Sequence, residues 1–521
     1  MDTKALRQKI LDLAIRGKLV PQDPKDEPAS VLLERIRAQK QQMVHEGKLK
    51  PKDIKDDTVI FVGEDNLHYE KFASGTIKCI ADEIPYELPE GWEWARLGSI
   101  ADTNLGKMLD AEKNKGVPRP YLRNINVRWG SFDLSDLLEM RIQDEEVERY
   151  SVRKGDLIVC EGGEPGRCAI WEDDDIVFFQ KALHRIRPYL VLSEYLFIVI
   201  SALSLSGLTE QYFTGTTIKH LTGQSLKALL IPIPTIHEQQ DICKIVNKAL
   251  MLIDCIENNR KELITVISST KAYILDLAIR GQLVQQDPTD EPATVLLARI
   301  RKERENLIKQ GNTKREGRDS VIYRGEDNSY YLQTGDLIES LSDWKFDKLP
   351  DTWAVCCLGE ICDYGNCINV ETDSIDDDAW ILDLEDIEKD TGKVLDRVKK
   401  RDRNAASTKH QFHTGQVLYS KLRPYLNKVV IADQDGFCTS EIIPLEFEHI
   451  VVPEYARYYL MSPAFLKYAN HCSYGVKMPR LGTADGKKAI VPLPPYMEQE
   501  RIAKAIHKAF AKLDSITESL S

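Results

Sequence analysis

The chain has no uninterrupted apolar run of 18 residues, and no charged stretch followed by an apolar one at its N-terminus. A membrane-spanning helix needs about 20 apolar residues, and a secretory leader needs that charged-then-apolar order. We therefore expect a soluble, unexported protein of the cytoplasm that does not contact a membrane. Given the length and the lack of a leader, the eleven cysteines fit reduced thiols better than a disulfide framework.

An excess of positive charge is also missing. Lys and Arg number 70 against 82 Asp and Glu, which gives a net charge of −12 over 521 residues. A protein that wraps nucleic acid on its own usually has the opposite balance. Any contact with nucleic acid would have to come from local basic patches or from basic surface on a partner. The length itself predicts two or three domains.

Sequence signatures of catalysis, cofactors and metals are absent. EGGEPGR (residues 161–167) lacks the GxxxxGK[ST] spacing of a phosphate-binding loop. LPPY (residues 493–496) resembles the tail of the (D/N)PPY methyltransferase signature, but a leucine stands where the amide or carboxylate would hold the target amino group. The cysteine spacing in CCLGEICDYGNC (residues 356–367) suits no familiar zinc ligand set. We predict no catalytic residues, no metal and no cofactor in this chain.

The stretch from Ile236 to Leu277 predicts a long helix, because it contains no Pro and no Gly. Steps of three and four residues mark a stripe of eleven positions, nine of them apolar, which is typical of a coiled-coil seam with one register-fixing Asn. At ~1.5 Å per residue the rod would be roughly 50 Å long. The alternative is an amphipathic helix packed on a globular core. The stripe runs through Ile242, Ile245, Ala249, Leu252, Ile256, Asn259, Leu263, Val266, Thr270, Tyr273 and Leu277.

Much of the chain is present twice. Residues 10–40 return as residues 274–304, with 23 of 31 positions identical. The near-identity around residues 18–60 and 282–322 favours the same kind of partner at both copies, although common ancestry alone would also explain it. We expect Pro28 in the first turn of a helix there. Three further matches follow in the same order: VIFVGEDN (59–66) with VIYRGEDN (321–328), LPEGWEWARLGSI (from 88) with LPDTWAVCCLGEI (from 349), and residues 231–254 with residues 491–514.

The repeat is circular. Asp514 matches Asp254 and Ile10 matches Ile274, so residues 496–521 followed by residues 1–17 rebuild the central helix with a short gap at the join. We infer a two-fold pseudosymmetric ring in which two globular domains are separated by two antiparallel helical spacers. One spacer is continuous, and the other is split between the two ends of the chain.

The two domains themselves differ. Residues 99–214 and 360–474 share little sequence, and both contain short apolar runs bounded by Gly, Pro and Asp, a pattern typical of short strands and loops. The predicted fold class is mixed α/β, with two pseudosymmetric globular domains, two antiparallel coiled-coil spacers and a circular internal repeat. The predicted segments are a helical region with the first repeat copy (1–87), a first globular domain (88–235), the central spacer with the second copy (236–348), a second globular domain (349–495) and a spacer helix that pairs with the central helix (496–521).

With these features together, the chain resembles the specificity subunit of a Type I restriction–modification system. The resemblance rests on IPIPTIHEQQDI (231–242), VPLPPYMEQERI (491–502), EGGEPGR, GTTIKHL (215–221) and the repeat layout over essentially the full length. Single motifs of this kind are weak, but their order within a duplicated chain is specific.

The resemblance implies two target-recognition domains, each reading one half of a split double-stranded DNA site, with the spacer length setting the gap. It also implies a non-catalytic scaffold for two adenine methyltransferase subunits, which use S-adenosylmethionine. Two motor–nuclease subunits, which use ATP and Mg, would complete the restricting enzyme. The main rival is an interaction scaffold that holds two identical partners without reading DNA. A self-contained methyltransferase is disfavoured by the missing signature.

Basic residues in two pairs of loops are the candidate DNA contacts. In EGGEPGR we expect a tight turn after a strand, with Arg167 exposed towards DNA, and Lys421, Arg423 and Lys428 replace its glycines in the second copy. GTTIKHL matches GVKMPRL (475–481), and cations there can donate to base edges or phosphates. These cations are Lys219, His220, Lys477 and Arg480. The alternative is a set of basic loops merely exposed to solvent.

The run RVKKRDR (397–403) holds five cations in seven residues. Lys399, Lys400 and Arg401 at its centre are candidates for a phosphate clamp, although a charge run is more often a solvated face. Residues 92–235 contain 17 basic and 20 acidic residues, and residues 353–495 contain 17 and 21. Because neither domain is basic, we expect weak DNA binding by the isolated chain.

Overall fold

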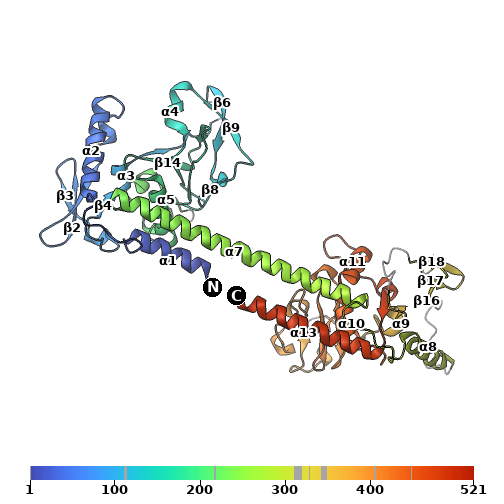
Figure 1. Ribbon diagram of the computed structural model, residues 1–521. Helices are drawn as coiled ribbons and strands as arrows, with labels where there is room; N and C mark the ends of the chain where they lie inside the picture. Colours follow the sequence, from blue (N-terminus) through green and yellow to red (C-terminus); the bar gives the residue numbers. More distant parts are fainter. Residues whose placement is uncertain are drawn as a thin grey trace. The chain divides into compact units, whose positions relative to one another are not determined.

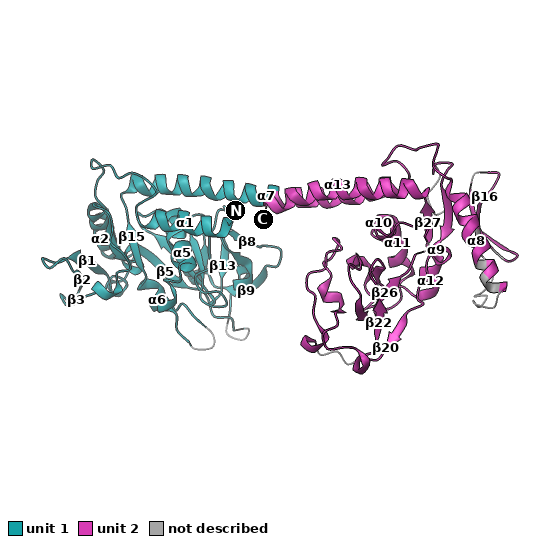
Figure 2. Cartoon of the chain, turned by 90° about the horizontal axis from the view of Figure 1, so that it is seen from below, with its two compact units in different colours: residues 1–259 teal, residues 260–521 magenta. Residues whose placement is uncertain are grey.

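The computed structural model describes residues 2–110, 114–215, 219–309, 320–327, 329–341, 349–403, 407–447 and 449–520. It divides into two compact units, which we describe separately: unit 1 (Met1–Asn259) and unit 2 (Arg260–Ser521) (Figure 1 and Figure 2). Among the described helices, none combines the length and apolar character needed to cross a membrane.

Unit 1 contains short helices, five small sheets and the first part of a long helix, α7 (Ile236–Ile279), which continues into unit 2. Its other helices are α1 (Thr3–Ile15), α2 (Ala29–His45), α3 (Leu97–Ile100), α4 (Val147–Tyr150), α5 (Ser193–Leu205) and α6 (Gly223–Lys227). Its strands are β1 (Thr58–Val62), β2 (His68–Phe72), β3 (Ile77–Cys79), β4 (Glu93–Arg96), β5 (Ala101–Leu105), β6 (Val117–Leu122), β7 (Val127–Arg128), β8 (Ser131–Phe132), β9 (Leu138–Ile142), β10 (Ser151–Val152), β11 (Leu157–Cys160), β12 (Cys168–Ile170), β13 (Val177–Phe179), β14 (Leu183–Pro188) and β15 (Leu230–Ile233).

Unit 2 repeats much of this order. Its helices are α8 (Ala293–Lys309), α9 (Leu358–Ile361), α10 (Pro453–Leu460), α11 (Pro463–Cys472), α12 (Thr483–Lys488) and α13 (Tyr496–Leu520). Its strands are β16 (Ser320–Arg324), β17 (Tyr330–Thr334), β18 (Leu337–Ser340), β19 (Ala354–Cys357), β20 (Ile368–Val370), β21 (Ile381–Leu382), β22 (Lys409–Phe412), β23 (Val417–Ser420), β24 (Val429–Ile431), β25 (Gly436–Thr439), β26 (Ile442–Leu445) and β27 (Ile490–Leu493).

The globular part of unit 1 is built on two four-stranded sheets, β12-β11-β14-β5 and β10-β13-β6-β9. Because successive residues of a strand face opposite sides, β11 serves two apolar cores. Leu157 and Val159 lie in the core that includes α1, α5 and the start of α7. Ile158 and Cys160 lie in a second core, which joins the two sheets and includes Phe179. The apolar run LIVC is therefore buried on both faces.

Unit 2 uses the same scaffold with different residues. Its sheets β24-β23-β26 and β20-β22-β25-β21 occupy the corresponding places, and Val417 and Tyr419 of β23 face one core while Leu418 faces the other. The parallel strand pairs of the two scaffolds also correspond, β6 with β13 and β21 with β25. The mixed α/β fold class is confirmed, and the two scaffolds correspond although their sequences share little.

The Glu of each EQ pair joins the spacer helix to the globular domain. Trp92 donates its indole N–H to Glu238 at 3.1 Å, and Trp353 makes the same contact with Glu498 at 3.1 Å. Both contacts are buried, so loss of the carboxylate would leave an indole N–H unsatisfied. Each pair ties the first turn of α7 or α13 to the segment that leads into β4 or β19.

The following Gln closes the same junction. Gln239 accepts a hydrogen bond from Leu192 N at 3.1 Å, and Gln499 accepts one from Val452 N at 2.8 Å. Each amide also donates to the carbonyl five residues earlier, at 3.3 and 3.0 Å. Because both side chains are fully buried, these bonds explain why the chain repeats EQ at this position.

Helix pairing is antiparallel within each unit. In unit 1, Arg7 of α1 forms an ion pair with Asp254 of α7, while Asp26, farther along the chain, reaches back to His237. In unit 2, Lys271 forms an ion pair with Asp514 at 2.5 Å and lies over the Phe510 ring at 5.2 Å. Figure 1 shows α1 and α13 lying along α7. The closure of the split spacer between the chain ends stays a prediction.

The predicted seam of α7 is wrong, because most of its positions lie on the uncovered side of the helix. Six of its apolar side chains are exposed, namely Ile245, Leu252, Ile256, Leu263, Val266 and Tyr273. The helix has a second apolar stripe, and that stripe packs inside the two units. Its buried residues are Val246, Ile253, Ile267, Leu275 and Ala278, whereas of the eleven predicted seam positions, all of them described, only Ile242 is buried. A period of three and four fits both stripes, so the period could not identify the covered one.

The repeated segment before α2 is anchored through the backbone. Ala29 N donates to Gly91 O at 2.9 Å, and Ala293 N donates to Thr352 O at 2.9 Å. Pro28 is the N-cap of α2, at φ −62°, and not a residue of its first turn as expected. The helix begins at Ala29, whose N–H has no partner within the helix and is bonded to Gly91 in the segment that leads into β4.

Candidate nucleic-acid interface

Each unit contains a short loop that is closed on itself. In the first closed loop (residues 214–220), Thr214 and His220 exchange two backbone hydrogen bonds of 2.9 Å. In the second closed loop (residues 474–480), Tyr474 and Arg480 do the same at 3.1 and 2.9 Å. Both loops turn at a glycine with positive φ, at residues 215 and 475, which a side chain would strain. Residues 216–218 lie outside the described residues.

The closed loops pack against the turns that the sequence marked separately. In unit 1, Leu221 N donates to Glu161 O at 2.7 Å, and the His220 ring lies beside Gly162. In unit 2, Leu481 N donates to Lys421 O at 3.0 Å, and Arg423 N donates to Pro479 O at 2.7 Å. Motifs some fifty residues apart in the sequence thus form one surface in each unit. This loop-and-turn surface is the candidate interface.

Lys219 and His220 are exposed on the first closed loop, as expected. Lys219 pairs with Glu210 at 3.1 Å and lies 5.9 Å from the centre of the Phe213 ring. An exposed ion pair of this kind contributes about 0–1 kcal/mol, so a phosphate can replace Glu210 at little cost. His220 holds the loop through its backbone and leaves its imidazole at the surface.

The two cations of the second closed loop differ in their surroundings. Lys477 is exposed near the tip. Arg480 forms a two-pronged pair with Glu441, at 3.0 Å from Nε and 2.8 Å from Nη2, and the bonds to this carboxylate raise the pKa of the guanidinium. A forked arginine–carboxylate pair is geometrically specific. Arg480 therefore fixes the loop, and Lys477 is the cation left available to a ligand.

Arg167 was predicted to be exposed, and this prediction is wrong. Its side chain is 17% exposed and donates to Glu164 at 2.9 Å and to Asn124 O at 2.9 Å. The glycines of the turn let the chain fold back so that Glu164 meets both Arg167 and the exposed Trp129, whose indole N–H donates to it at 2.8 Å. Asn124 also donates to Gly162 O at 2.8 Å. These supports for the turn come from distant segments and gave no signal in the sequence.

The turn residues of unit 2 are also largely engaged. Lys428 donates to Leu384 O at 2.5 Å, and burial lowers the pKa of its ammonium. Arg423 and Asn427 have positive φ values of 50° and 51° on either side of the short helix η9 (Pro424–Leu426). Such conformations cost of order 1–3 kcal/mol each in non-glycine residues. Lys421 is half-buried beside the loop, so Lys428 does not point towards a ligand and Lys421 does so only in part.

The basic run at 397–403 faces carboxylates of its own domain. Folding brings the acidic segment at 376–378 against it, and Trp380 pairs with Lys399 as an isolated β-bridge. This arrangement neutralises the run and does not favour a phosphate clamp by Lys399, Lys400 or Arg401. The ion pairs are Arg397–Asp433, Lys399–Asp378 (2.8 Å), Lys400–Asp377 (3.1 Å), Arg401–Asp378 (3.1 Å) and Arg403–Asp386 (2.7 Å).

The cysteine cluster is part of a strand and its neighbours. Cys356 and Cys357 belong to β19, which pairs with β27, and burial raises the pKa of Cys357 to about 12. Within the described ranges no group of three or more His, Cys, Asp or Glu side chains converges as a metal site would require. The cluster packs as small apolar side chains.

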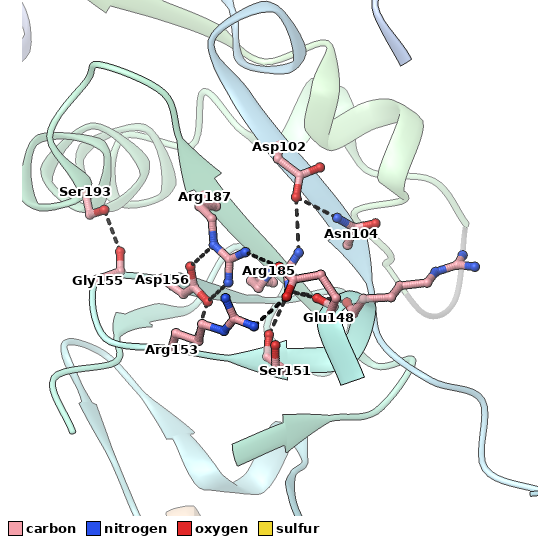
Figure 3. Close-up of polar contacts among 11 residues, drawn as sticks. Asp102, Asn104, Glu148, Ser151, Arg153, Gly155, Asp156, Arg185, Arg187 and Ser193 are labelled. Carbon is pink, nitrogen blue, oxygen red and sulfur yellow. Dashed lines mark hydrogen bonds and ion pairs between the residues drawn. The ribbon is translucent and has the colours of Figure 1, made fainter. Parts of the chain in front are cut away.

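A buried polar network, which the sequence did not reveal, supports the first domain (Figure 3). Arg185 of β14 is 2% exposed and donates to Asp102 at 3.1 Å. Arg187 forms a fork with Asp156, at 2.7 Å for both bonds. The network ties β14 to β5 and to the α4–β10 segment. Arg185 also donates to the carbonyls of Glu148 (3.2 Å), Arg149 (3.3 Å) and Ser151 (2.7 Å).

Comparison with known families adds an independent observation. The model of the Type I restriction modification DNA specificity domain matches the chain twice, over residues 89–266 and 350–521. Each match begins just before β4 or β19 and extends into α7 or to the end of the chain. The matches therefore coincide with the two scaffolds and their spacer helices.

Two curated relatives from Escherichia coli are similar along much of the chain. The Type I restriction enzyme EcoEI specificity subunit is 29% identical over 421 residues, which cover 69% of this chain and 61% of that protein. The EcoAI specificity subunit is 28% identical over 415 residues, which cover 70% of this chain and 63% of that protein. The chain thus spans less than two thirds of the length of both relatives.

One solved structure shares the fold. It is a chain from a study of complex assembly and conformational transition of the type I R-M system, with a TM-score of 0.52 and 18% sequence identity. The similarity covers 84% of this chain and 94% of that one. At this identity the similarity extends to the fold alone.

Proposed function

The chain belongs to the family of the Type I restriction modification DNA specificity domain, and from this membership we propose that it is the non-catalytic subunit that reads DNA in a Type I restriction–modification complex. In this proposal each unit reads one half of a split double-stranded site through its loop-and-turn surface. Lys219 and His220 act in unit 1, and Lys477 acts in unit 2 on a loop held by Arg480.

One observation carries the proposal: the frame contacts repeat, and the surfaces between them differ. The buried Trp–Glu and Gln–backbone bonds are the same in both units. The closed loops share the paired backbone bonds and a glycine with positive φ, but their sequences differ, GTTIKH against GVKMPR. A constant frame with two variable surfaces is what separate reading of two unlike half-sites requires.

The proposal includes partners. Two adenine methyltransferase subunits would bind the repeated frame and supply catalysis with S-adenosylmethionine, and two motor–nuclease subunits would supply ATP- and Mg-dependent restriction. This chain would contain neither cofactor. Neither globular domain is basic, so basic surface on the partners would supply much of the affinity for DNA. The complex would act in the cytoplasm.

The exposed stripe on α7 supports a partner at the spacer. Ile245, Leu252 and Leu263 lie uncovered on one side of the helix. Large contiguous apolar patches on an isolated chain commonly mark protein interfaces. We assign this stripe to the methyltransferase partners and the helix itself to the spacer that sets the gap between half-sites.

Replacement of the variable part of one globular domain tests the proposal; we call this part the head, and it comprises residues 99–214 in unit 1 and residues 360–474 in unit 2. The chain with residues 99–214 replaced by the corresponding head of a relative is co-expressed with its methyltransferase subunit, and methylated adenines are mapped across the genome. We expect one half of the motif to change and the other half to stay the same. A change in both halves would rule out separate reading by two units.

The same experiment separates the rival function. An interaction scaffold that does not read DNA would give the same methylated motif, or none, whichever head it contained. The matched control exchanges residues 360–474 instead, and it should change the other half of the motif. The buried Trp–Glu bonds lie outside both exchanged segments, so each chimera keeps them. The partners of the two glutamines, Leu192 N and Val452 N, are backbone groups inside the exchanged segments, and the new segment supplies a backbone N–H at the same place.

A further inference from the structure

Apolar side chains at the tip of the second closed loop are uncovered in the described structure. Val476 is fully exposed, and Tyr474 and Met478 on either side of it are also exposed. Tyr425 of η9, on the adjoining turn, is exposed as well. Lys477 lies among them. Four exposed apolar side chains in neighbouring turns do not stabilise the protein while they face water. We therefore expect a ligand to cover them.

The loop that holds them is fixed from several sides. Tyr474 and Arg480 close it by paired backbone bonds, and the Arg480–Glu441 fork holds its second end. Pro479 accepts a bond from the turn at 2.7 Å. A Cβ on Gly475 would lie 3.1 Å from Met478 O, so the loop is tight as well as closed. Val476 itself is β-branched and stiff at χ1. The exposed tip is therefore pre-organised.

The size and composition of the tip favour nucleic acid over protein. A stable protein interface buries ~800 Å² per partner, far more than four side chains on two adjacent turns offer. In the major groove, by contrast, the thymine 5-methyl is a single small apolar group, and side chains read it by apolar contact. Lys477, between Val476 and Met478, would meet a neighbouring phosphate or guanine at the same time.

We propose that Val476 and Met478 contact the 5-methyl group of a thymine in the half-site read by unit 2. This inference rests on the proposed function and makes it specific, because it names the chemical group that the second closed loop recognises. The contact is worth about fourfold in binding, which corresponds to the ~0.8 kcal/mol of one buried CH₂ or methyl group.

A selection from random duplex DNA tests the contact and identifies the bound sequence in the same experiment. The full chain, purified with its co-expressed methyltransferase subunit, selects from two libraries, one made with dTTP and one with dUTP, which lacks only the methyl group. We expect one thymine position of the bound half-site to lose about fourfold in enrichment in the dUTP library. Val476→Ser should show the same loss with the dTTP library and no further loss with the dUTP library.

A matched control is Val62→Ser, which alters an exposed valine at the end of β1 in unit 1 and should bind as the unaltered chain does. Equal enrichment from both libraries would overturn the inference and leave the proposed function standing. Val476→Ser losing affinity equally in both libraries would also overturn it, in favour of a wedge between bases. If neither library were enriched in any sequence, the proposed function and this inference would both fall.

Discussion

Asp26 accepts a hydrogen bond at 2.9 Å from His237, and this pair ties the loop before α2 to the first turn of α7. Unit 2 anchors the corresponding loop with a different pair, Arg501 and Asp290, at 2.5 Å. The same junction is thus closed by a titratable cation in one unit and by a permanent one in the other. Only the junction of unit 1 is expected to respond to pH near neutrality.

The first prediction concerns this junction. The hydrogen bond to Asp26 raises the pKa of His237 above its ordinary 6.5, and the bond from His237 lowers the pKa of Asp26 below 3.8. The stabilisation is therefore complete between pH 3.8 and 6.5, is lost as pH rises through the folded-state pKa of His237, and is lost as pH falls through that of Asp26. NMR titration of ¹³C-labelled histidine should give a midpoint above 6.5 for His237, and Asp26→Asn should return it to the ordinary value. An unchanged midpoint in Asp26→Asn would refute the pairing.

The second prediction concerns the free cation of the second closed loop. Lys477→Ala in the assembled complex should weaken DNA binding and reduce the slope of log K against log salt by ~1, because one phosphate contact is lost. If Lys477 instead donates to a guanine, the slope stays the same and preference at one base pair relaxes. Lys467→Ala, which alters an exposed lysine of α11, is the control in a salt titration of fluorescence anisotropy. A slope and a motif that both stay unchanged would show that Lys477 is solvent-exposed only.

The third prediction tests whether Arg480 supports the second closed loop or contacts DNA itself. If Arg480 holds the loop through Glu441, then Glu441→Gln should impair reading of the unit 2 half-site as Arg480→Gln does. If Arg480 donates directly to DNA, Glu441→Gln should leave binding unchanged or strengthen it, because the guanidinium is released. Binding of matched and mismatched duplexes by both variants checks this. We expect the two variants to lose specificity together.

The fourth prediction concerns the buried network of unit 1. Arg185→Met should destabilise the chain by about 1–3 kcal/mol, because it leaves the buried carbonyl of Ser151 without its donor and removes the part-buried bonds to Asp102 and to two further carbonyls. Arg153→Met is the control, since Arg153 is exposed and pairs with Glu148 at the surface, a contact worth about 0–1 kcal/mol. Urea unfolding of both variants gives the difference. Equal midpoints for the two variants would show that the network is not a support.

The fifth prediction concerns the spacer. Four residues inserted after Asn259 add ~6 Å to α7 at ~1.5 Å per residue. Base pairs stack at ~3.4 Å, so the gap between half-sites should widen by one or two base pairs while each half keeps its sequence. Four residues make slightly more than one turn, so the packed stripe is nearly preserved. Methylation mapping of the variant measures the gap. If the variant methylated only sites with the original gap, the length of α7 would not set the distance between the half-sites.

The sequence predicted the frame well because its repeats are local and its contacts are set by residue type. The central helix was expected from Ile236 to Leu277 and extends from Ile236 to Ile279. The repeated EQ pairs do make equivalent buried contacts in both units. The seam failed because α7 has two apolar stripes of the same period. Which stripe is covered depends on α1 and α13, whose approach no period within α7 encodes.

The candidate interface was predicted only in part. The basic motifs, which the sequence marked separately, meet on one loop-and-turn surface in the fold, as the bonds of Lys421 and Arg423 to the second closed loop and to Leu481 show. What the sequence could not show was which cations meet carboxylates after folding. Arg480 meets Glu441, 39 residues away, and Lys399 meets Asp378, 21 residues away. Pairing over such distances depends on the domain fold. A run of basic residues has the same sequence whether or not carboxylates neutralise it in the folded protein.

The pairing of Arg7 with Asp254 also dictates an order of events during synthesis. At about 5–20 residues per second, a ribosome needs roughly 10–50 s to make the 247 residues between them. Throughout that time Leu11 and Ile15, both buried in the finished unit, have no α7 to pack against. α1 packs on α5 as well, which is made earlier, so its contact with α7 is the one that forms late. Until then the side of α1 that meets α7 stays open to a chaperone or to mispairing.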